Sequence, residues 1–211
     1  YDKGMKKSLL RICAAMLVLL LPTMVSAQRI ERTINEAWRF TRDGKSVEVV
    51  NIPHSWNRFD SVDDTPGYFR GVGIYEKVLR INEDVDAHSF YIYFEGANQV
   101  TELWVNDHYV GKHIGGYSAF CFDITKSVRQ GDNRLKIKVD NSHNLDIPPL
   151  SADFTFFGGI YRDLNLIVTP KTHISTTHYA SSGVYISTSE LSDHSAKVEL
   201  RTMLTNNCAK K

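Results

Sequence analysis

The chain has 211 residues, of which 42% are hydrophobic and 23% charged, with 25 basic and 24 acidic side chains. This composition is that of an ordinary globular protein, and the length allows one full domain plus a piece or two small domains. Four basic residues and one acidic residue lie among the first 27, so 21 basic and 23 acidic residues follow. No basic stripe remains, and we expect no nucleic-acid partner.

The first 27 residues have the features of a secretory signal. Lys6 and Lys7 form a basic start, residues 9–25 are mainly apolar, and Val25-Ser-Ala27 places small residues at the expected cleavage point. Residues 1–4 precede Met5 and are interpreted as an upstream extension. We therefore expect a secreted or periplasmic protein with no membrane contact after cleavage. The alternative is a membrane anchor, which the short uninterrupted apolar run disfavours.

Three cysteines fall in different settings. Cys13 lies within the expected signal, and Cys121 stands between two phenylalanines, as a buried apolar residue would. A Cys121–Cys208 disulfide would suit an oxidising compartment, but the two residues lie in separate predicted units. The sequence has no C-x-x-C spacing, and we expect no structural zinc site.

The first half of the chain after the signal is a series of short apolar segments. Their alternation and the intervening Gly and Pro residues predict β-strands. The segments are 35–40, 47–50, 74–81 and 89–95, and Ile52-Pro-His-Ser-Trp-Asn57 forms an extended turn after the second.

Residues 94–111 predict a β-hairpin. Thr101, Leu103 and Val105 alternate with polar or aromatic residues, and Asn106-Asp107 supplies a polar turn. Asn98 lies at the rim between two strands, where a short amide can be held in a loop.

The remainder of this first unit continues the pattern. Residues 115–125 contain an aromatic strand, Gly131-Asp-Asn133 predicts a turn, and residues 135–139 and 164–168 predict two further strands. Between these two strands, residues 142–157 form a long irregular loop, a feature that is often functional in compact domains.

A second β unit follows Pro170. Val184, Ile186 and Thr188 alternate along one strand, and residues 196–207 predict another. About 40 residues are too few to bury an independent core.

Several ordered segments resemble the N-terminal sugar-binding domain of glycoside hydrolase family 2. They are Ile52-Pro-His-Ser-Trp-Asn57, the hairpin 94–111, residues 115–125 and Gly158-Gly-Ile-Tyr-Arg-Asp163. Asp107 stands where the family usually has glycine. The resemblance covers roughly residues 33–205. It implies an all-β chain, with a jelly-roll β-sandwich over 28–170 and the truncated start of an immunoglobulin-like sandwich over 171–211.

The resemblance also implies an activity for the family, which cleaves terminal β-glycosides with two glutamates of a (β/α)8 barrel. The barrel motifs do not occur in this sequence. Glu36 and Glu83 follow asparagines, as the family's acid/base does, but both lie in turns of the wrong domain. We therefore expect no catalytic residue here and no hydrolysis by this chain alone. A β-galactoside is the favoured substrate of the full-length enzyme, whose oligomeric state is left open.

Two residues match family positions that contact the terminal sugar, Asn98 and Asp153. An amide both donates and accepts hydrogen bonds, and an ionised carboxylate can accept two from sugar hydroxyls. The resemblance further implies a monovalent cation near Asp153 in the full-length enzyme. We expect no other cofactor and no metal site.

Alternatives from other classes remain. His54 could act as a base, although a structural role is favoured because no nucleophile accompanies it. The chain could also be a stand-alone carbohydrate-binding module, with an aromatic platform of Phe154, Phe156 and Phe157. A third alternative is a structural or adhesion sandwich, in which the 142–157 loop packs down and Asn98 and Asp153 are paired internally.

Overall fold

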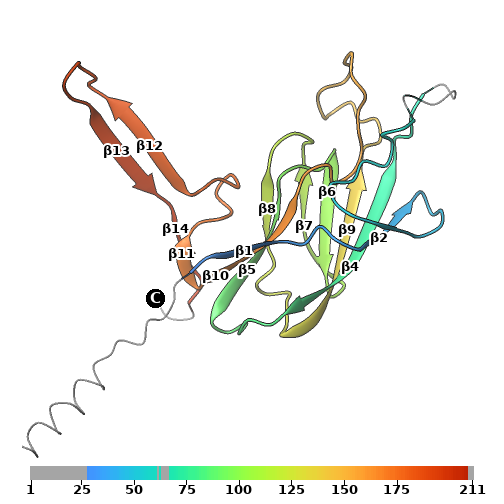
Figure 1. The fold of residues 1–211 in the computed structure, drawn as a ribbon, viewed down its shortest axis with the longest axis horizontal. Helices are drawn as coiled ribbons and strands as arrows, with labels where there is room; N and C mark the ends of the chain where they lie inside the picture. Colours follow the sequence, from blue (N-terminus) through green and yellow to red (C-terminus); the bar gives the residue numbers. More distant parts are fainter. Residues whose placement is uncertain (1–27, 61, 63–66, 209–211) are drawn as a thin grey trace, which may run out of the picture.

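The computed structural model describes residues 28–60, 62 and 67–208, and the predicted signal at residues 1–27 lies outside this range. The described residues form strands, turns and irregular segments and contain no helix (Figure 1). A membrane-spanning helix is accordingly not found in the described part of the chain. The prediction of an all-β protein is confirmed.

Fourteen strands make up the described chain. In chain order they are β1 (Ile30–Thr33), β2 (Trp38–Arg42), β3 (Glu48–Val50), β4 (Val72–Ile81), β5 (His88–Phe94), β6 (Val100–Val105), β7 (His108–Ile114), β8 (Phe120–Asp123), β9 (Gly131–Asp140), β10 (Leu164–Pro170), β11 (Thr172–Ile174), β12 (Val184–Ser189), β13 (Lys197–Thr202) and β14 (Leu204–Asn206).

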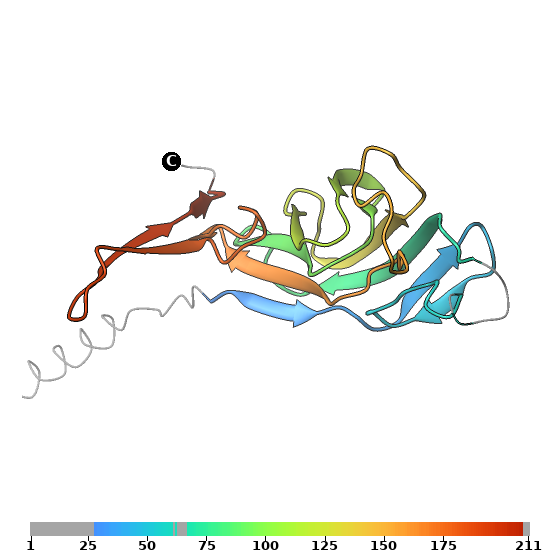
Figure 2. The same cartoon turned by 90° about the horizontal axis from the view of Figure 1, so that it is seen from above.

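Ten of these strands form two antiparallel sheets that face each other (Figure 2). One sheet has six strands in the order β3-β2-β4-β9-β6-β7, and the other has four in the order β1-β10-β5-β8. The two longest strands, β4 and β9, pair along ten residues in the middle of the larger sheet. The pairs β2–β3 and β6–β7 follow each other in sequence, but β4 and β9, and every neighbouring pair in the smaller sheet, are distant in sequence and are joined by crossover connections. The predicted β-sandwich is confirmed.

The core lies between the two sheets and is built from alternate residues of each strand. Tyr75, Ile81 and Ile137 of the larger sheet and Phe94 and Ile92 of the smaller one are fully buried. In β9 buried and exposed residues alternate as strand periodicity requires, whereas in β5 Tyr91, next to Ile92, is also buried. Each buried side chain of this size contributes about 1.5–3 kcal/mol to folding.

The predicted hairpin turn at Asn106-Asp107 is confirmed. Both residues have positive φ angles, 51° and 67°, and Val105 pairs directly with His108. These values define a type I′ turn, whose twist matches that of the strands it joins. Asn and Asp accept the left-handed conformation more readily than other residues, which explains why Asp107 can replace glycine here.

The predicted turn at Gly131–Asn133 is wrong. These residues begin β9 and pair with Ile81, Arg80 and Leu79. The turn comes earlier and is closed by Asn133, whose buried amide donates to Arg129 O at 2.7 Å and accepts from Arg129 N at 2.9 Å. Glycine and asparagine thus serve a strand entrance rather than the turn itself.

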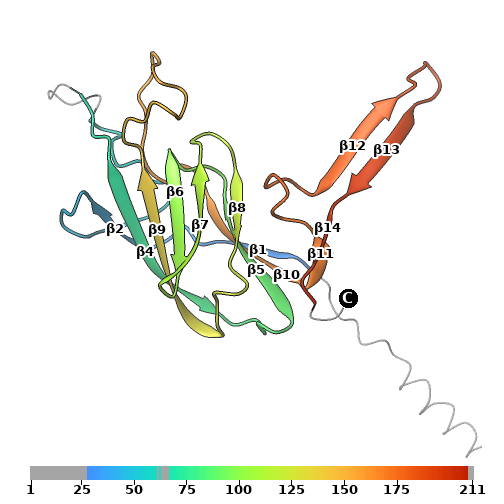
Figure 3. The same cartoon turned by 180° about the vertical axis from the view of Figure 1, so that it is seen from behind.

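Residues 171–208 form two separate ribbons, β11–β14 and β12–β13, beside the sandwich (Figure 3). The predicted strand at 184–188 is confirmed as part of β12. The single strand predicted for 196–207 is two strands, because Met203 leaves the ribbon and bonds to Gly183 and Ser175. The assignment to an immunoglobulin-like domain stays a prediction.

Partly buried polar contacts join this second unit to the sandwich. The Tyr91 hydroxyl donates to His173 Nε2 at 2.8 Å, since His173 Nδ1 carries the proton that bonds Pro170 O. Asn207 Nδ2 reaches Ser89 Oγ at 3.0 Å. The thiols of Cys121 and Cys208 are both free, so the structure holds no disulfide between them.

Candidate functional site

The end of the 142–157 loop is fixed by three buried asparagines, Asn57, Asn98 and Asn141, which we name the asparagine clamp. Asn57 and Asn141 each donate from Nδ2 to Phe156 O at 3.0 Å. Asn98 Nδ2 donates to Phe157 O at 2.6 Å. Three side chains from three distant parts of the sequence therefore hold two consecutive peptide groups.

Two of the clamp asparagines, Asn57 and Asn141, are hydrogen-bonded through both the nitrogen and the oxygen of their side-chain amides. Asn57 Oδ1 accepts from Gly158 N at 2.9 Å, and Asn141 Oδ1 accepts from Gly71 N at the same distance. Buried polar groups of this kind must be bonded, and an amide can act as donor and acceptor at once. The clamp thus provides an irregular segment with the hydrogen bonds that a regular strand would obtain from its neighbours.

The two glycines at 158 and 159 let this segment approach the sandwich closely. A Cβ at Gly158 would lie 2.3 Å from the Trp56 ring, and one at Gly159 would lie 2.3 Å from His54 O. Gly159 also has a φ of +124°, which disfavours any side chain. The Gly-Gly pair is therefore required by packing at the base of the loop.

Asn98 is 3% exposed and belongs to this internal network. Its backbone N donates to Gly159 O at 3.0 Å, and Gly159 N donates back to Asn98 O at 3.3 Å. This internal pairing is the arrangement expected of a purely structural residue. A sugar contact by Asn98 stays a prediction.

Asp153 has the opposite environment. It is exposed, and its carboxylate makes no hydrogen bond or ion pair with another residue of the described ranges. The neighbouring rings of Phe154 and Phe157 are 51% and 41% exposed. A carboxylate beside two accessible rings can accept hydroxyl hydrogen bonds while the rings cover apolar C–H surface. The contact of Asp153 with a sugar stays a prediction.

Phe156 does not belong to an exposed aromatic platform. Its ring is only 6% exposed and lies beneath the Arg70 guanidinium, 4.7 Å from the ring centroid. Arg70 Nε in turn donates to Asn141 O at 2.8 Å. The proposed three-ring platform is therefore reduced to Phe154 and Phe157, with Phe156 as their anchor.

His54 has a structural environment. Tyr75 Oη accepts from Ile160 N, so its proton points to His54 Nδ1, 2.9 Å away. Burial, together with the positive charges of Arg58 and Arg42, lowers the pKa of His54 to about 4. The ring is therefore neutral at pH 7 and fixes the segment that opposes Gly159.

One of the two glutamates that follow asparagines in the sequence has a structural partner. Glu83 is paired with Arg32 at 2.8 Å. The ranges covered by the structure contain no group of three or more His, Cys, Asp or Glu side chains placed to hold a metal ion.

The sequence identified Asn98 and Asp153 as candidates at this loop, but it did not predict the structural roles of Asn57, Asn141 and Gly159. Asn57 and Gly159 lie in segments that resemble the family, directly after Trp56 and in the Gly-Gly pair, and Asn141 directly follows β9. An asparagine that ends an apolar strand is the signal that could have identified the clamp, because such a residue must be bonded when it is buried.

Known proteins with related sequences and structures agree with this architecture. The model of the family "Glycosyl hydrolases family 2, sugar binding domain" matches residues 25–170. A β-glucuronidase of Bacteroides fragilis is 37% identical over 91% of this chain and 28% of its own length. A β-galactosidase of Thermoanaerobacter pseudethanolicus is 34% identical over 77% of this chain and 22% of its own length.

A solved structure shows the same fold. The crystal structure of a Bacteroides uniformis β-glucuronidase superposes with a TM-score of 0.80 and 33% identity, over 86% of this chain and 23% of that one. The chain thus spans less than a third of each of these relatives. With its sandwich, its ordered motifs and its family match together, the chain belongs to glycoside hydrolase family 2 and contains the family's N-terminal sugar-binding domain.

Proposed function

We propose that this chain is the sugar-binding part of a secreted family 2 glycosidase and that Asp153 contacts the terminal sugar of the substrate. The observation that carries this proposal is the contrast at one loop. Its base is fixed by the buried asparagine clamp, while its Asp153 carboxylate and the Phe154 and Phe157 rings face outward. A contact group on a fixed base loses less conformational entropy on binding than one on a free loop.

The proposed substrate is a terminal β-glycoside. The relatives named above are β-galactosidases and β-glucuronidases, and they support either a β-galactoside or a β-glucuronide. Hydrolysis requires two carboxylates in a shared site, which we assign to a part of the full-length enzyme outside these residues. The signal-like residues 1–27 support export, and a monovalent cation beside Asp153 remains part of the proposal.

Isothermal titration calorimetry of the chain with methyl β-D-galactoside and methyl β-D-glucuronide tests the proposal. Asp153→Asn keeps the size of the side chain but removes its charge, and we expect roughly tenfold weaker binding, in line with the loss of a charged hydrogen bond. Asp146→Asn is the matched control, because Asp146 is exposed in the same loop. Equal affinities of the two variants for both sugars would overturn the role of Asp153.

A further inference from the structure

The outer face of the six-stranded sheet carries a straight row of charged and aromatic side chains. In the strand register Arg39 lies opposite Glu76, Glu76 opposite Lys136, Lys136 opposite Trp104, and Trp104 opposite Tyr109. We name these five residues the cross-strand row. They lie on five adjacent strands, β2, β4, β9, β6 and β7, so the row is about 19 Å long at the usual strand spacing.

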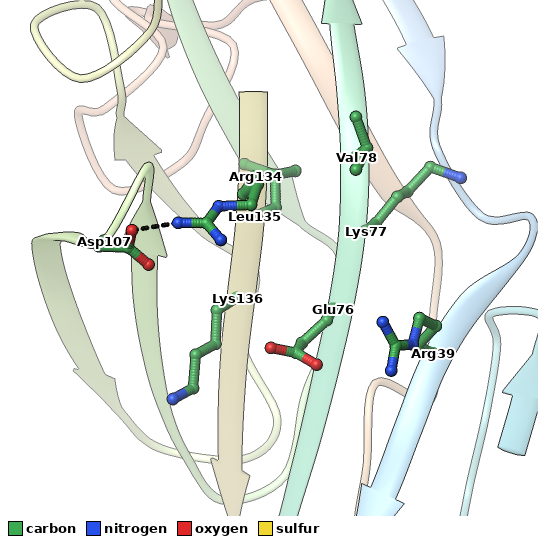
Figure 4. A pocket seen from close by; sticks show the side chains of 8 residues that line it. All are labelled: Arg39, Glu76, Lys77, Val78, Asp107, Arg134, Leu135 and Lys136. Carbon is green, nitrogen blue, oxygen red and sulfur yellow. Dashed lines mark hydrogen bonds and ion pairs between the residues drawn. The ribbon is translucent and has the colours of Figure 1, made fainter. Parts of the chain in front are cut away.

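The charged half of the row is open. Figure 4 shows the Glu76 side chain between those of Lys136 and Arg39, on a shallow pocket that Val78 and Arg134 also line. Arg39, Glu76 and Lys136 are all exposed, and no ion pair joins any of them to another residue within the described ranges. The row therefore presents two cations around one carboxylate.

Three cations beside the row already form ion pairs with carboxylates. Arg134 is paired with Asp107, Lys138 with Glu102 at 3.0 Å, and Arg80 with Asp132 at 3.7 Å. An ion pair of this kind has no net charge, so it attracts a charged ligand only weakly. Arg39 and Lys136 therefore keep their charge available to a ligand within the cross-strand row, and the exposed Lys112, next to Glu102 on β7, adds a third cation to the same face.

The other half of the row is aromatic. The Trp104 and Tyr109 rings meet edge to face with centroids 5.4 Å apart, and Tyr109 is 54% exposed. The Lys136 ammonium lies 5.6 Å from the Trp104 ring centroid, where the charge and the aromatic surface adjoin. Rings of this kind offer an apolar face with a polar edge, which suits the C–H face of a pyranose.

We propose that the cross-strand row binds an acidic polysaccharide whose sugar units carry carboxylates. The rings would receive a pyranose face, Arg39 and Lys136 would pair with uronate carboxylates, and Glu76 would accept hydroxyl hydrogen bonds. This surface lies on the sheet face, whereas Asp153 belongs to the loop at the sandwich rim, and the proposal does not depend on the role of Asp153.

The same chemistry disfavours other occupants. A polyphosphate chain could pair with Arg39 and Lys136, but it has no hydroxyl groups to donate hydrogen bonds to the Glu76 carboxylate between them, whereas a polysaccharide does. A second copy of the chain needs a contiguous apolar centre, whereas Val78 and Tyr109 are separated by charged residues on this face. Charge complementarity with spaced carboxylates remains the best match.

Affinity electrophoresis and calorimetry with polygalacturonate test the proposal, with fully methyl-esterified pectin as the uncharged counterpart. We expect the chain to bind polygalacturonate, to bind the ester at least tenfold more weakly, and to lose affinity between 50 and 300 mM NaCl, because exposed charge pairs are screened by salt. The double variant Arg39→Gln/Lys136→Gln should reduce the affinity roughly tenfold, as expected for two exposed ion pairs.

Control variants distinguish binding at the cross-strand row from unspecific charge attraction and from binding at the 142–157 loop. Lys45→Gln/Lys126→Gln removes two cations elsewhere, and Asp153→Asn alters the rim; both should bind polygalacturonate as the unchanged chain does. Tyr109→Ala, at an exposed position, should weaken binding to both polysaccharides. Equal binding of acid and ester, or equal losses in the Lys45/Lys126 control, would overturn the proposal, as would failure of the unchanged chain to bind polygalacturonate.

Discussion

Asn98 and Asp153 were predicted as sugar contacts by the same kind of argument, yet they occupy opposite environments. Asn98 is 3% exposed and donates a hydrogen bond to Phe157 O, whereas Asp153, four residues before Phe157 in the loop, is exposed. The comparison shows that a polar residue near a loop can either hold the buried base of the loop in place, as Asn98 does, or project from its exposed rim, as Asp153 does. Base residues should control stability, and rim residues should control binding.

The largest effect is expected at the base, from Gly159→Ala. A Cβ there meets His54 O at 2.3 Å, and the φ of +124° is unfavourable for alanine. We expect the free energy of unfolding to fall by about 3 kcal/mol or more, because both strain and a steric clash must be relieved. Urea denaturation followed by tryptophan fluorescence measures the change.

Gly44→Ala is the matched control for this substitution. Gly44 also has a positive φ, +68°, but a Cβ there would meet nothing within 4 Å. Its cost should be limited to about 1–2 kcal/mol of backbone strain. A similar cost for both alanine variants would show that close packing at the loop base contributes little.

The next effect is expected from Asn57→Ala in the clamp. The substitution leaves Gly158 N without its acceptor and removes a donor from Phe156 O, in a fully buried site. Losses of about 2–3 kcal/mol are typical when buried partners are left unsatisfied. Thermal unfolding should register the loss, while the exposed Asn82→Ala should lie within about 0.5 kcal/mol of the unchanged chain.

A smaller effect depends on pH and on His54. The unfolded chain takes up a proton on this histidine near its ordinary pKa of 6.5, whereas the folded chain resists protonation until about pH 4. The unfolded state therefore binds more protons in this window, and the free energy of unfolding falls as the pH drops from 6.5 to 4. The loss should be about 1–2 kcal/mol after discounting for the partial exposure of the ring.

Denaturation curves of the unchanged chain and His54→Gln at pH 7, 5.5 and 4 test this dependence. The difference between the two proteins isolates His54 from His113 and His173, whose pKa values are also lowered, first of all by burial. The unchanged chain should lose more stability than the variant over this range. Parallel pH profiles would contradict the neutral, hydrogen-bonded role of the ring.

The smallest effect on stability is expected at the rim, from Asp153→Asn. The side chain is exposed and unpaired within the described residues, so the free energy of unfolding should change by less than about 0.5 kcal/mol. Urea denaturation of this variant beside Asn98→Ala measures the contrast directly. A loss above 1 kcal/mol for Asp153→Asn would mean that the carboxylate supports the loop and does not merely project from it.

The sandwich was predictable because strand periodicity is a local property. The alternation of Thr101, Leu103 and Val105 with their neighbours indicated which face is buried, and Asn106-Asp107 indicated the turn. Gly131–Asn133 was assigned wrongly because turn-forming residue types also occur at strand entrances. Only the pairing with residues 79–81, some 50 positions earlier, distinguishes the two cases.

The site was less predictable because its contacts join distant parts of the chain. The partner of Asn98 is a carbonyl 59 residues later, and nothing in the local sequence reports that bond. The orientation of Phe156 was equally hidden, since residues in an irregular loop follow no fixed alternation. Chemistry-bearing residues could be identified from the sequence, but their assignment to base or rim required the structure.

The most direct test of this division is a heteronuclear NMR titration of the chain with methyl β-D-galactoside and methyl β-D-glucuronide. We predict that the backbone amide signals of residues 153–157 shift with at least one sugar and that Asp153→Asn abolishes the shifts while the rest of the spectrum stays native. Shifts that persist in Asp153→Asn, or that fall only outside the loop, would contradict the assignment of Asp153 to the binding rim.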